Sequence, residues 1–300
     1  MVARQTGQLS LRVAYLACAE VLPGAVDRRP DAFEHDQEIA AFRPALEDRG
    51  AQLIEVDWRL CDPAAYDLLL VRTTWDYVKH QAEFLDFLQK ARTVTPLENP
   101  LDVISWNLSK RYLLELIGKG LPVIPSVFVE KPTPVLGIFD TLETDELVLK
   151  PVVGAGGFGQ SKLRREDVSE GAVMPAALFA QPLIPDIVTA GEISMIFVDG
   201  AFSHALRKSP AKGEYRIQVL HGGRSEVHHP TPDEIAAAKK FVDALPAPAL
   251  ACRVDLVPHR GQLLLMELEA IEPHLFPEFG PDLGPLVAQA CLNRSLTSAT

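Results

Sequence analysis

Short apolar segments alternate with amphipathic segments over the first hundred residues of the chain. Residues 11–18, 52–57 and 67–71 are apolar runs bounded by polar residues, which is typical of buried strands. Residues 33–49 and 83–90 instead repeat apolar side chains at helical spacing. Strands that alternate with helices predict an α/β domain with a parallel sheet, whose binding edge lies beyond the carboxyl ends of the strands.

The pattern changes after Asn99–Pro100, where a domain boundary is expected. One helix is predicted to follow, capped by Ser105 or Asn107 and ended by Gly118. Asp199–Gly200 lies between two later apolar runs and is a strong hairpin signal. This half of the chain is therefore predicted to be α+β with an antiparallel sheet. Its expected strands span residues 123–129, 147–150, 177–181, 193–198, 201–207, 215–220, 252–257 and 263–269, with a helix at 233–245.

Composition and charge narrow the classes of function. The 300 residues are enough for two or three small domains around a shared cleft. The net charge of -11 argues against nucleic acid as a main partner, because phosphate binding needs clustered Lys and Arg. Four scattered cysteines without a CxxC pair fit free thiols in the cytoplasm. Arg12 interrupts the first apolar run, which favours a strand over a signal peptide, and no run reaches the ~18 residues of a membrane span.

A glycine-rich segment follows Lys150, and Gly154, Gly156 and Gly159 in it form a GxGxxG pattern. A dinucleotide fingerprint requires a helix directly after the glycines, whereas residues 160–165 are predicted to be a returning strand. The alternative is a glycine-rich hairpin that folds its backbone N–H groups over a triphosphate, with Lys150 as a point charge. An ordinary turn with a solvated lysine stays open at this point.

Three carboxylates are expected on one face of a C-terminal hairpin. Glu267 and Glu269 are two apart on a strand and point the same way. If the hairpin closes around residues 260–262, Asp255 lies directly opposite Glu267. Such carboxylates repel unless a cation or basic groups lie among them, and magnesium prefers oxygen ligands. Scattered surface acids are the alternative, which the flanking leucines disfavour because they indicate an inner strand.

A dense basic segment of this otherwise acidic chain contains Arg207, Lys208, Lys212 and Arg216. One interpretation is a salt-bridged surface loop. The other is a clamp that neutralises a transferring phosphoryl group.

In this order, these pieces resemble the ATP-grasp superfamily, most closely its glutathione synthetase-like branch. The resemblance covers nearly the whole chain and is most specific from residue 107 to residue 273. It implies an α/β N-terminal domain at 1–100, a central subdomain with the glycine-rich flap at 101–185, and a C-terminal subdomain with the metal carboxylates at 186–300. ATP is then expected between the last two parts, and the acceptor substrate toward the first.

The resemblance also implies a role for individual residues. Arg207 and Arg216 match arginines that face the transferred phosphoryl group. Asp255, Glu267 and Glu269 match a triad for one or two Mg2+ ions, which Mn2+ can replace. Relatives usually carry Asn at the third of these positions and often carry Arg where this chain has Ser194, so metal count and carboxylate binding stay open. The residues expected to bind ATP are two phosphate lysines, Lys110 and Lys150; the flap over the phosphates, with Gly154, Gly156, Gly157, Phe158 and Gly159; an adenine-binding hinge with Gln181 and Leu183; and Glu192 near the ribose.

The implied reaction is ATP-dependent activation of a carboxyl or carbonyl-type group, followed by attack of a nitrogen nucleophile. Residues 71–77, 203–208 and 267–273 resemble a subgroup that includes the cyclo-ligase forming cycloserine from O-ureidoserine. A two-substrate carboxylate–amine ligase, a small-molecule phosphotransferase and a regulatory nucleotide-binding protein are the alternatives. A homo-oligomer is left open. The candidates for recognising a small amino-acid-like substrate, or else for a structural turn, are Arg72, Trp75 and Asp76.

Overall fold

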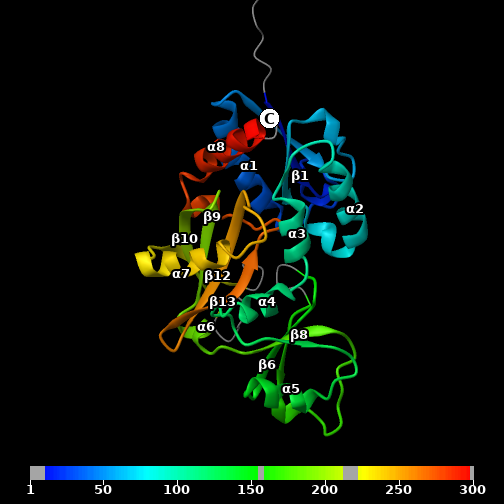
Figure 1. Ribbon diagram of the computed structural model, residues 1–300, viewed down its shortest axis with the longest axis vertical. Coiled ribbons are helices and arrows are strands. Elements are labelled where there is room, and N and C mark those ends of the chain that lie inside the picture. Colours follow the sequence, from blue (N-terminus) through cyan, green and yellow to red (C-terminus); the bar gives the residue numbers. More distant parts are fainter. Residues whose placement is uncertain (1–10, 155–158, 212–221, 298–300) are drawn as a thin grey trace, which may run out of the picture. The chain divides into compact units, whose positions relative to one another are not determined.

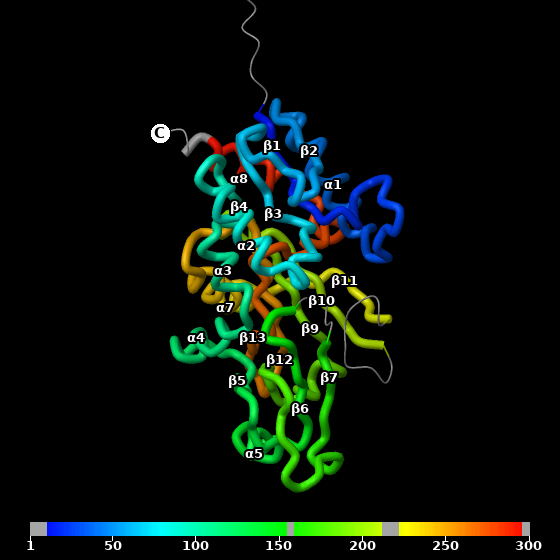
Figure 2. The backbone as a smooth tube through the Cα atoms, turned by 90° about the vertical axis from the view of Figure 1, so that its right-hand side faces the viewer, coloured from blue at the N-terminus to red at the C-terminus, as the bar shows by residue number. Residues whose placement is uncertain are grey.

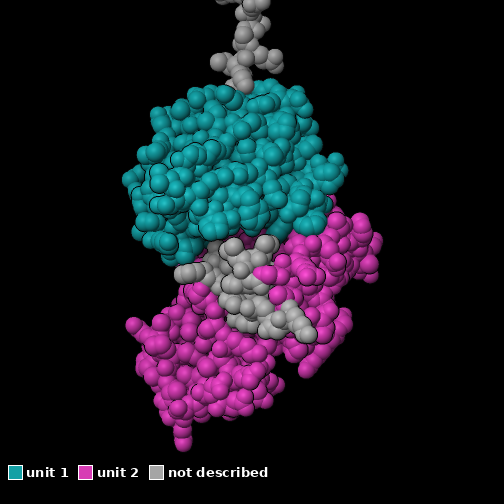
Figure 3. Space-filling view, turned by 180° about the vertical axis from the view of Figure 1, so that it is seen from behind, with its two compact units in different colours: residues 1–101, 274–300 teal, residues 102–273 magenta. Residues whose placement is uncertain are grey.

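The computed structural model describes residues 11–154, 159–211 and 222–297. The chain forms two compact units, coloured separately in Figure 3. Unit 1 comprises residues 1–101 and 274–300, and unit 2 comprises residues 102–273. Residues 274–300, which were expected in a C-terminal subdomain, therefore belong with the N-terminal part of the chain. Within the described ranges, none of the helices combines the length and the apolar character that crossing a membrane requires.

Unit 1 contains a four-stranded parallel sheet in the order β2-β1-β3-β4, which confirms the predicted α/β class. Its strands are β1 (Leu11–Ala17), β2 (Ala51–Asp57), β3 (Leu68–Thr73) and β4 (Leu97–Glu98). Figure 2 shows β1, β2 and β3 side by side. Every residue of β3 is buried, as expected for an inner strand of a parallel sheet.

The helices of unit 1 are α1 (Ala32–Glu47), α2 (Gln81–Ala91) and α8 (Leu283–Thr297). Helix α8 was not predicted, and it packs against α1 although the two are far apart in sequence (Figure 1). Gly284 permits this approach, since a Cβ atom on it would lie 2.2 Å from the carbonyl oxygen of Ala41. The shorter 3-10 turns are η1 (Ala19–Val21), η2 (Pro63–Ala65), η3 (Trp75–Lys79) and η6 (Pro277–Phe279).

Replacing Gly284 with alanine is expected to destabilise unit 1 by about 1–3 kcal/mol, because the added methyl group forces α8 away from α1. Gly137 in helix α5 (Val135–Leu142) is the matched control, since a Cβ atom there meets nothing within 4 Å. Alanine at that position should be neutral or stabilise the protein by up to about 1 kcal/mol. Urea unfolding of both variants compares the two effects. Equal stability of the two variants would contradict the close helix approach.

Unit 2 begins with two helices where one was predicted. Helix α3 (Leu101–Asn107) ends early, and α4 (Tyr112–Gly118) starts anew. The side chain of Asn107 explains the break, because it donates to the carbonyl oxygen of Leu268 at 2.8 Å and accepts from the backbone N–H of Ala270 at 2.8 Å. Asn107 therefore anchors the end of a helix to the C-terminal hairpin and does not cap the start of one.

The first sheet of unit 2 is antiparallel, with the strand order β5-β8-β6-β7. Its bounds are β5 (Val127–Val129), β6 (Glu146–Lys150), β7 (Ser161–Arg164) and β8 (Leu178–Pro182). Strand β7 returns antiparallel to β6, as predicted after the glycine-rich segment. Helix α5 contributes Phe139, which is fully buried, to the small core on this sheet. The 3-10 turn η4 (Arg165–Asp167) follows β7.

The second sheet of unit 2 is five-stranded and antiparallel, in the order β11-β10-β9-β12-β13. The β9–β10 hairpin turns at Asp199–Gly200, as predicted, and both residues have positive φ. Helix α7, close to its predicted range and started by a capping box on Thr231, lies against this sheet (Figure 1). The strand predicted at 215–220 lies outside the described residues. The remaining bounds are α6 (Asp186–Thr189), β9 (Glu192–Val198), β10 (Ala201–Ser209), β11 (Arg224–His228), α7 (Pro232–Val242), β12 (Ala251–His259) and β13 (Gln262–Glu269).

Candidate active site

The β12–β13 hairpin brings the predicted carboxylates together. Asp255 lies directly opposite Glu267, and Arg253 lies opposite Glu269, which confirms the predicted register. Arg260 and Gly261 form the turn with φ values of 49° and 77°. Because opposite residues on paired strands share a face, all four side chains project from the same side of the sheet.

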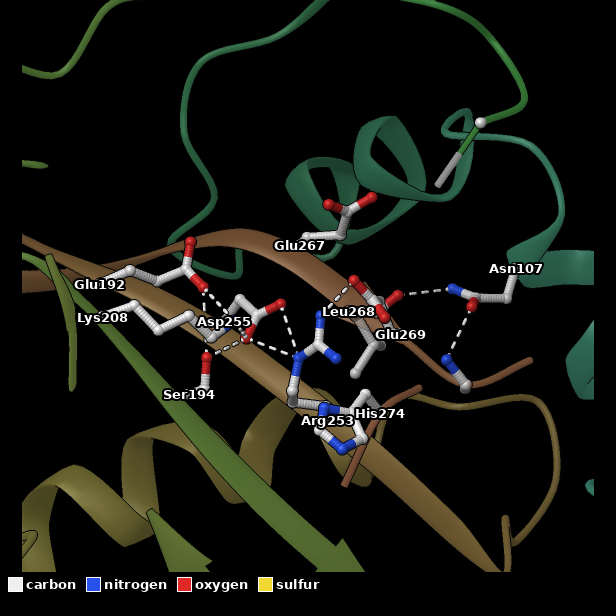
Figure 4. Close-up of polar contacts among 12 residues, drawn as sticks. Asn107, Glu192, Ser194, Lys208, Arg253, Asp255, Glu267, Leu268, Glu269 and His274 are labelled. Atoms are coloured by element: carbon white, nitrogen blue, oxygen red, sulfur yellow. Dashed lines mark hydrogen bonds and ion pairs between the residues drawn. The ribbon is translucent and has the colours of Figure 1, made fainter. Parts of the chain in front are cut away.

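Asp255 is held by three neighbours at the centre of this face (Figure 4). The Nε of Arg253 donates to both of its carboxylate oxygens at 3.0 Å, and the hydroxyl of Ser194 donates to Oδ1. The Nζ of Lys208 lies 3.5 Å from Oδ1. Burial alone would raise the pKa of Asp255, but Arg253 and Lys208 outweigh burial and lower it. Asp255 is therefore an ionised carboxylate between two buried cations.

Lys208 also binds Glu192 on the neighbouring strand. Its Nζ donates to Oε1 of Glu192 at 2.9 Å, and the two residues are opposite each other in the β9–β10 register. Burial raises the pKa of Glu192 to about 7, against the lowering effect of Lys208. The second oxygen of Glu192 is buried and has no hydrogen-bond partner in the part of the chain that the structure describes. That oxygen is able to accept a hydrogen bond from a ligand.

Two lysines lie near Glu267, another acid of this cluster. Lys110, between α3 and α4, forms an ion pair with Glu267 and donates to the carbonyl oxygen of Gly154 at 3.3 Å. Lys150 ends strand β6 and is almost fully buried. Burial lowers the pKa of Lys150, while the charge of Glu267 opposes that shift. The two predicted phosphate lysines therefore lie near one carboxylate.

Arg207 lies outside this cluster. Its Nη1 donates to the carbonyl oxygen of Ala190, and its Nη2 lies 3.3 Å from Nδ1 of His228. Successive strand residues point to opposite faces, so Lys208 reaches the acids and Arg207 does not. The guanidinium of Arg207 thus faces away from the acids, and its role beside the phosphoryl group stays a prediction. Gly156, Gly157, Phe158 and Arg216 lie outside the described residues.

The predicted adenine-binding segment lies at the end of β8. Gln181 is buried and donates to the hydroxyl of Ser126 at 2.9 Å, while the backbone N–H of Leu183 donates to the carbonyl oxygen of Glu146 at 3.0 Å. A separate apolar cluster adjoins this segment. It comprises the buried Ile124, Ile184, Ile187 and Val257, with Leu264 and Met266 packed against them.

The predicted substrate residues lie in unit 1, where their polar groups bind other parts of that unit. The guanidinium of Arg72 donates to both oxygens of Glu38, at 3.0 and 2.7 Å, in a fully buried pair. Asp76 accepts from the indole N–H of Trp58 at 2.8 Å and pairs with Arg59. Trp75 is half-buried and stacks with the guanidinium of Arg29 at 5.2 Å. These contacts support structural roles for Arg72 and Asp76, and their contact with substrate stays a prediction.

Replacing Glu38 with glutamine is expected to destabilise the protein by about 3 kcal/mol at neutral pH, because Arg72 loses its buried partner. Burial would raise the pKa of Glu38, but Arg72 lowers it overall. The contribution of Glu38 is therefore present above the unfolded pKa of about 4.3 and is lost as the pH falls through the lower folded value. Unfolding the wild type and this variant from pH 7 to pH 3 should show the difference shrinking in acid. Glu47, exposed on the same helix, is the control for a glutamine substitution outside a buried ion pair.

The donor chemistry of the carboxylates fits a divalent metal ion, since Asp255, Glu267 and Glu269 all offer oxygens from one sheet face. Cations of the chain take up these oxygens in the structure, because Arg253 pairs with both Asp255 and Glu269. Over the described ranges, no three His, Cys, Asp or Glu side chains are arranged to hold a metal ion. The metal role of the three carboxylates remains a prediction.

Comparisons with known proteins agree with the fold. Residues 122–254 match the family model of the prokaryotic glutathione synthetase ATP-grasp domain. Residues 13–99 match the model of the D-cycloserine synthetase DcsG N-terminal domain. Together these two matches span most of the chain, which is an ATP-grasp ligase with an ATP-grasp domain of the glutathione synthetase type. The ATP-grasp fold implies binding of ATP with a divalent metal ion.

Within this class, the chain is similar to the cycloserine biosynthesis protein DcsG of Streptomyces lavendulae. The two are 29% identical over 259 residues, which cover 80% of this chain and 85% of the relative. The crystal structure of D-cycloserine synthetase DcsG matches with a TM-score of 0.77 at 26% identity, over 95% of this chain and 99% of the other. The fold is also that of D-alanine–D-alanine ligase from Bacillus anthracis complexed with ATP, with a TM-score of 0.67 at 14% identity over 96% and 98% of the chains.

Proposed function

We propose that this ligase phosphorylates a carboxyl or carbonyl-type oxygen of a small amino-acid-like substrate and then joins the activated carbon to a nitrogen atom. The substrate oxygen attacks the γ-phosphorus of ATP, and ADP leaves. The nitrogen then attacks the activated carbon, loses a proton and expels phosphate. The observation that carries this proposal is the single sheet face on which Lys208 and Arg253 alternate with Glu192, Asp255 and Glu267.

In this proposal, the cations of the cluster stabilise charge that moves between phosphate and substrate. Lys110 and Lys150 bind the phosphates of ATP, while Lys208 and Arg253 neutralise the transferring phosphoryl group. Gln181 and Leu183 bind adenine beside the apolar cluster, and the unpartnered oxygen of Glu192 accepts from ribose. Glycines 154 to 159 cover the phosphates. Arg216 is proposed to face the transferring phosphoryl group, as the resemblance of its sequence segment implies.

Magnesium, with manganese as a substitute, would be held by Asp255, Glu267 and Glu269 and would supply charge neutralisation at the β- and γ-phosphates. The chain's own residues set the geometry around it. Ser194 and Arg253 fix the carboxylate of Asp255 in one orientation, since both donate to it. The four cysteines are free thiols, which supports the proposed cytoplasmic location.

The similarity to a cycloserine biosynthesis protein favours an intramolecular reaction, in which substrate and nucleophile are one molecule. A tethered nucleophile reacts at a high effective concentration and needs no separate amine site. Ser194, where two-substrate relatives often carry Arg, fits this version. O-ureido-D-serine is therefore the first compound to try. A two-substrate carboxylate–amine ligase is the second candidate, which the glutathione synthetase domain match favours.

The test is a screen for ADP and phosphate release with amino acids and their derivatives, supplied singly and then in pairs. The proposal expects release with at least one compound and a product with a new C–N bond in its mass spectrum. If O-ureido-D-serine alone suffices, the reaction is intramolecular. A product mass equal to two substrates less water establishes the two-substrate ligase. Accumulation of a stable phosphorylated compound would instead identify a phosphotransferase and overturn the ligase proposal.

A further inference from the structure

One phosphate lysine and one metal carboxylate of the proposed site form an ion pair with each other. Lys110 lies between α3 and α4, and Glu267 lies on β13, yet their side chains are in direct contact. The side chain of Lys110 is 11% exposed and that of Glu267 is 28% exposed. Water therefore screens this pair only partly, and each charge depends on the other for compensation.

Lys150 provides an internal comparison. It is as buried as Lys110 and its pKa responds to the charge of Glu267. Among the described residues, however, no hydrogen bond or ion pair joins the ammonium group of Lys150 to a carboxylate. Of these two lysines with the same proposed ligand, Lys110 is the one that pairs directly with an acid of the metal group within the described part of the chain.

We propose that the Lys110–Glu267 ion pair makes the binding of nucleotide and the binding of metal depend on each other. This inference rests on the proposed ATP and metal site. A nucleotide that binds alone must draw Lys110 away and leave the partly buried Glu267 without its paired counter-charge. A metal ion that binds alone must likewise leave Lys110 without its partner. When both bind, phosphate compensates Lys110 and the metal compensates Glu267, so the two costs disappear together.

This coupling is additional to the direct contact between metal and phosphate, because it is carried by two groups of the protein. Couplings of this kind are typically about 5- to 150-fold and are reciprocal between the two ligands. The coupling disfavours the binding of a nucleotide without its metal ion. The site would then be filled by the complete metal–nucleotide pair in preference to either component.

Two variants test the coupling through binding alone. Glu267→Gln releases Lys110, so the affinity for ATP in the presence of a chelator should rise by about tenfold. Lys110→Gln releases Glu267, so the affinity for Mn2+ without nucleotide should also rise by about tenfold. Calorimetry measures the first effect and electron paramagnetic resonance of free Mn2+ measures the second. Lys150→Gln is the matched control for the second measurement, and its effect should stay below about threefold.

A double variant separates pairing from general repulsion. In the Lys110→Gln background, Glu267→Gln should no longer raise the affinity for ATP in the presence of a chelator. If the gain persists there, or if Lys150→Gln strengthens Mn2+ binding as much as Lys110→Gln, the ion pair is not the coupling element and the inference is wrong. Thermal unfolding tests whether each variant is folded. If Glu267→Gln does not fold, Glu267→Asp replaces it, because its shorter side chain holds the carboxylate farther from Lys110. Failure of the wild type to bind ATP with magnesium would instead overturn the proposed function itself.

Discussion

Replacing Glu267 with glutamine is expected to lower kcat by about 10²- to 10³-fold while the protein stays folded. The substitution keeps the shape of the side chain and removes one negative charge from the face that carries Asp255. In the proposed mechanism this charge holds the metal ion against the transferring phosphoryl group. The loss should therefore persist at saturating magnesium, because it affects the transition state and not only metal occupancy.

The measurement is steady-state ADP release over a magnesium titration, together with the thermal unfolding midpoint. Glu170→Gln, at an exposed position of unit 2, is the control and should leave kcat unchanged. Near-normal turnover of the Glu267 variant at high magnesium would contradict the metal role of this carboxylate.

Lys208 and Arg207 offer a second test with a large expected difference. Lys208→Met should lower kcat by about 10²- to 10³-fold, because the cation facing Asp255 and Glu192 is lost from the phosphoryl site. Arg207→Met should lower kcat by less than about tenfold, since its guanidinium faces the other side of β10 and binds a backbone carbonyl. Methionine keeps much of each side chain's length, so the two variants differ mainly in which face loses a charge.

Both variants are first compared with the wild type by thermal unfolding, because Lys208 also compensates two buried acids. A larger loss of kcat in Arg207→Met than in Lys208→Met would show that the phosphoryl cation had been assigned to the wrong residue.

Period-two alternation and turn chemistry were sufficient to predict the carboxylate hairpin. The turn at residues 260–262 fixes the register, and counting back from it places Asp255 opposite Glu267. The same reasoning located the β9–β10 hairpin at Asp199–Gly200 and the strand that returns after the glycine-rich segment. These features depend on residues close together in the sequence, so local patterns could specify them.

The orientation of Lys208 could not be predicted, because it depends on an irregularity in the sheet. The register of β10 against β9 shifts between Phe202 and His204. Continued without the shift, the pairing from Ala201 and Val198 would place Arg207 opposite Glu192, whereas the shift places Lys208 there. One additional residue in a strand thus changes which cation faces the acids.

Contacts between distant parts of the chain account for the other differences. Asn107 was expected to cap a helix, but it binds the backbone of a hairpin more than 160 positions away. Helix α8 has mixed apolar character along its length, and its place beside α1 depends on the fit at Gly284. The position of Arg72 after a predicted strand leads to the expectation of a substrate role, which stays a prediction, and gives no sign of the buried acid Glu38, which pairs with Arg72 from a helix earlier in the chain. No local pattern specifies such partners.

The central claim is that the γ-phosphoryl group of ATP passes to an oxygen atom of the substrate. It is tested most directly with substrate labelled with oxygen-18 in the carboxyl or carbonyl group that becomes bonded to nitrogen. Phosphorylation of that oxygen followed by nitrogen attack moves the label into inorganic phosphate, so the account predicts phosphate carrying one oxygen-18 atom for each product molecule. Unlabelled phosphate beside a fully labelled product, or formation of AMP and pyrophosphate, would contradict it.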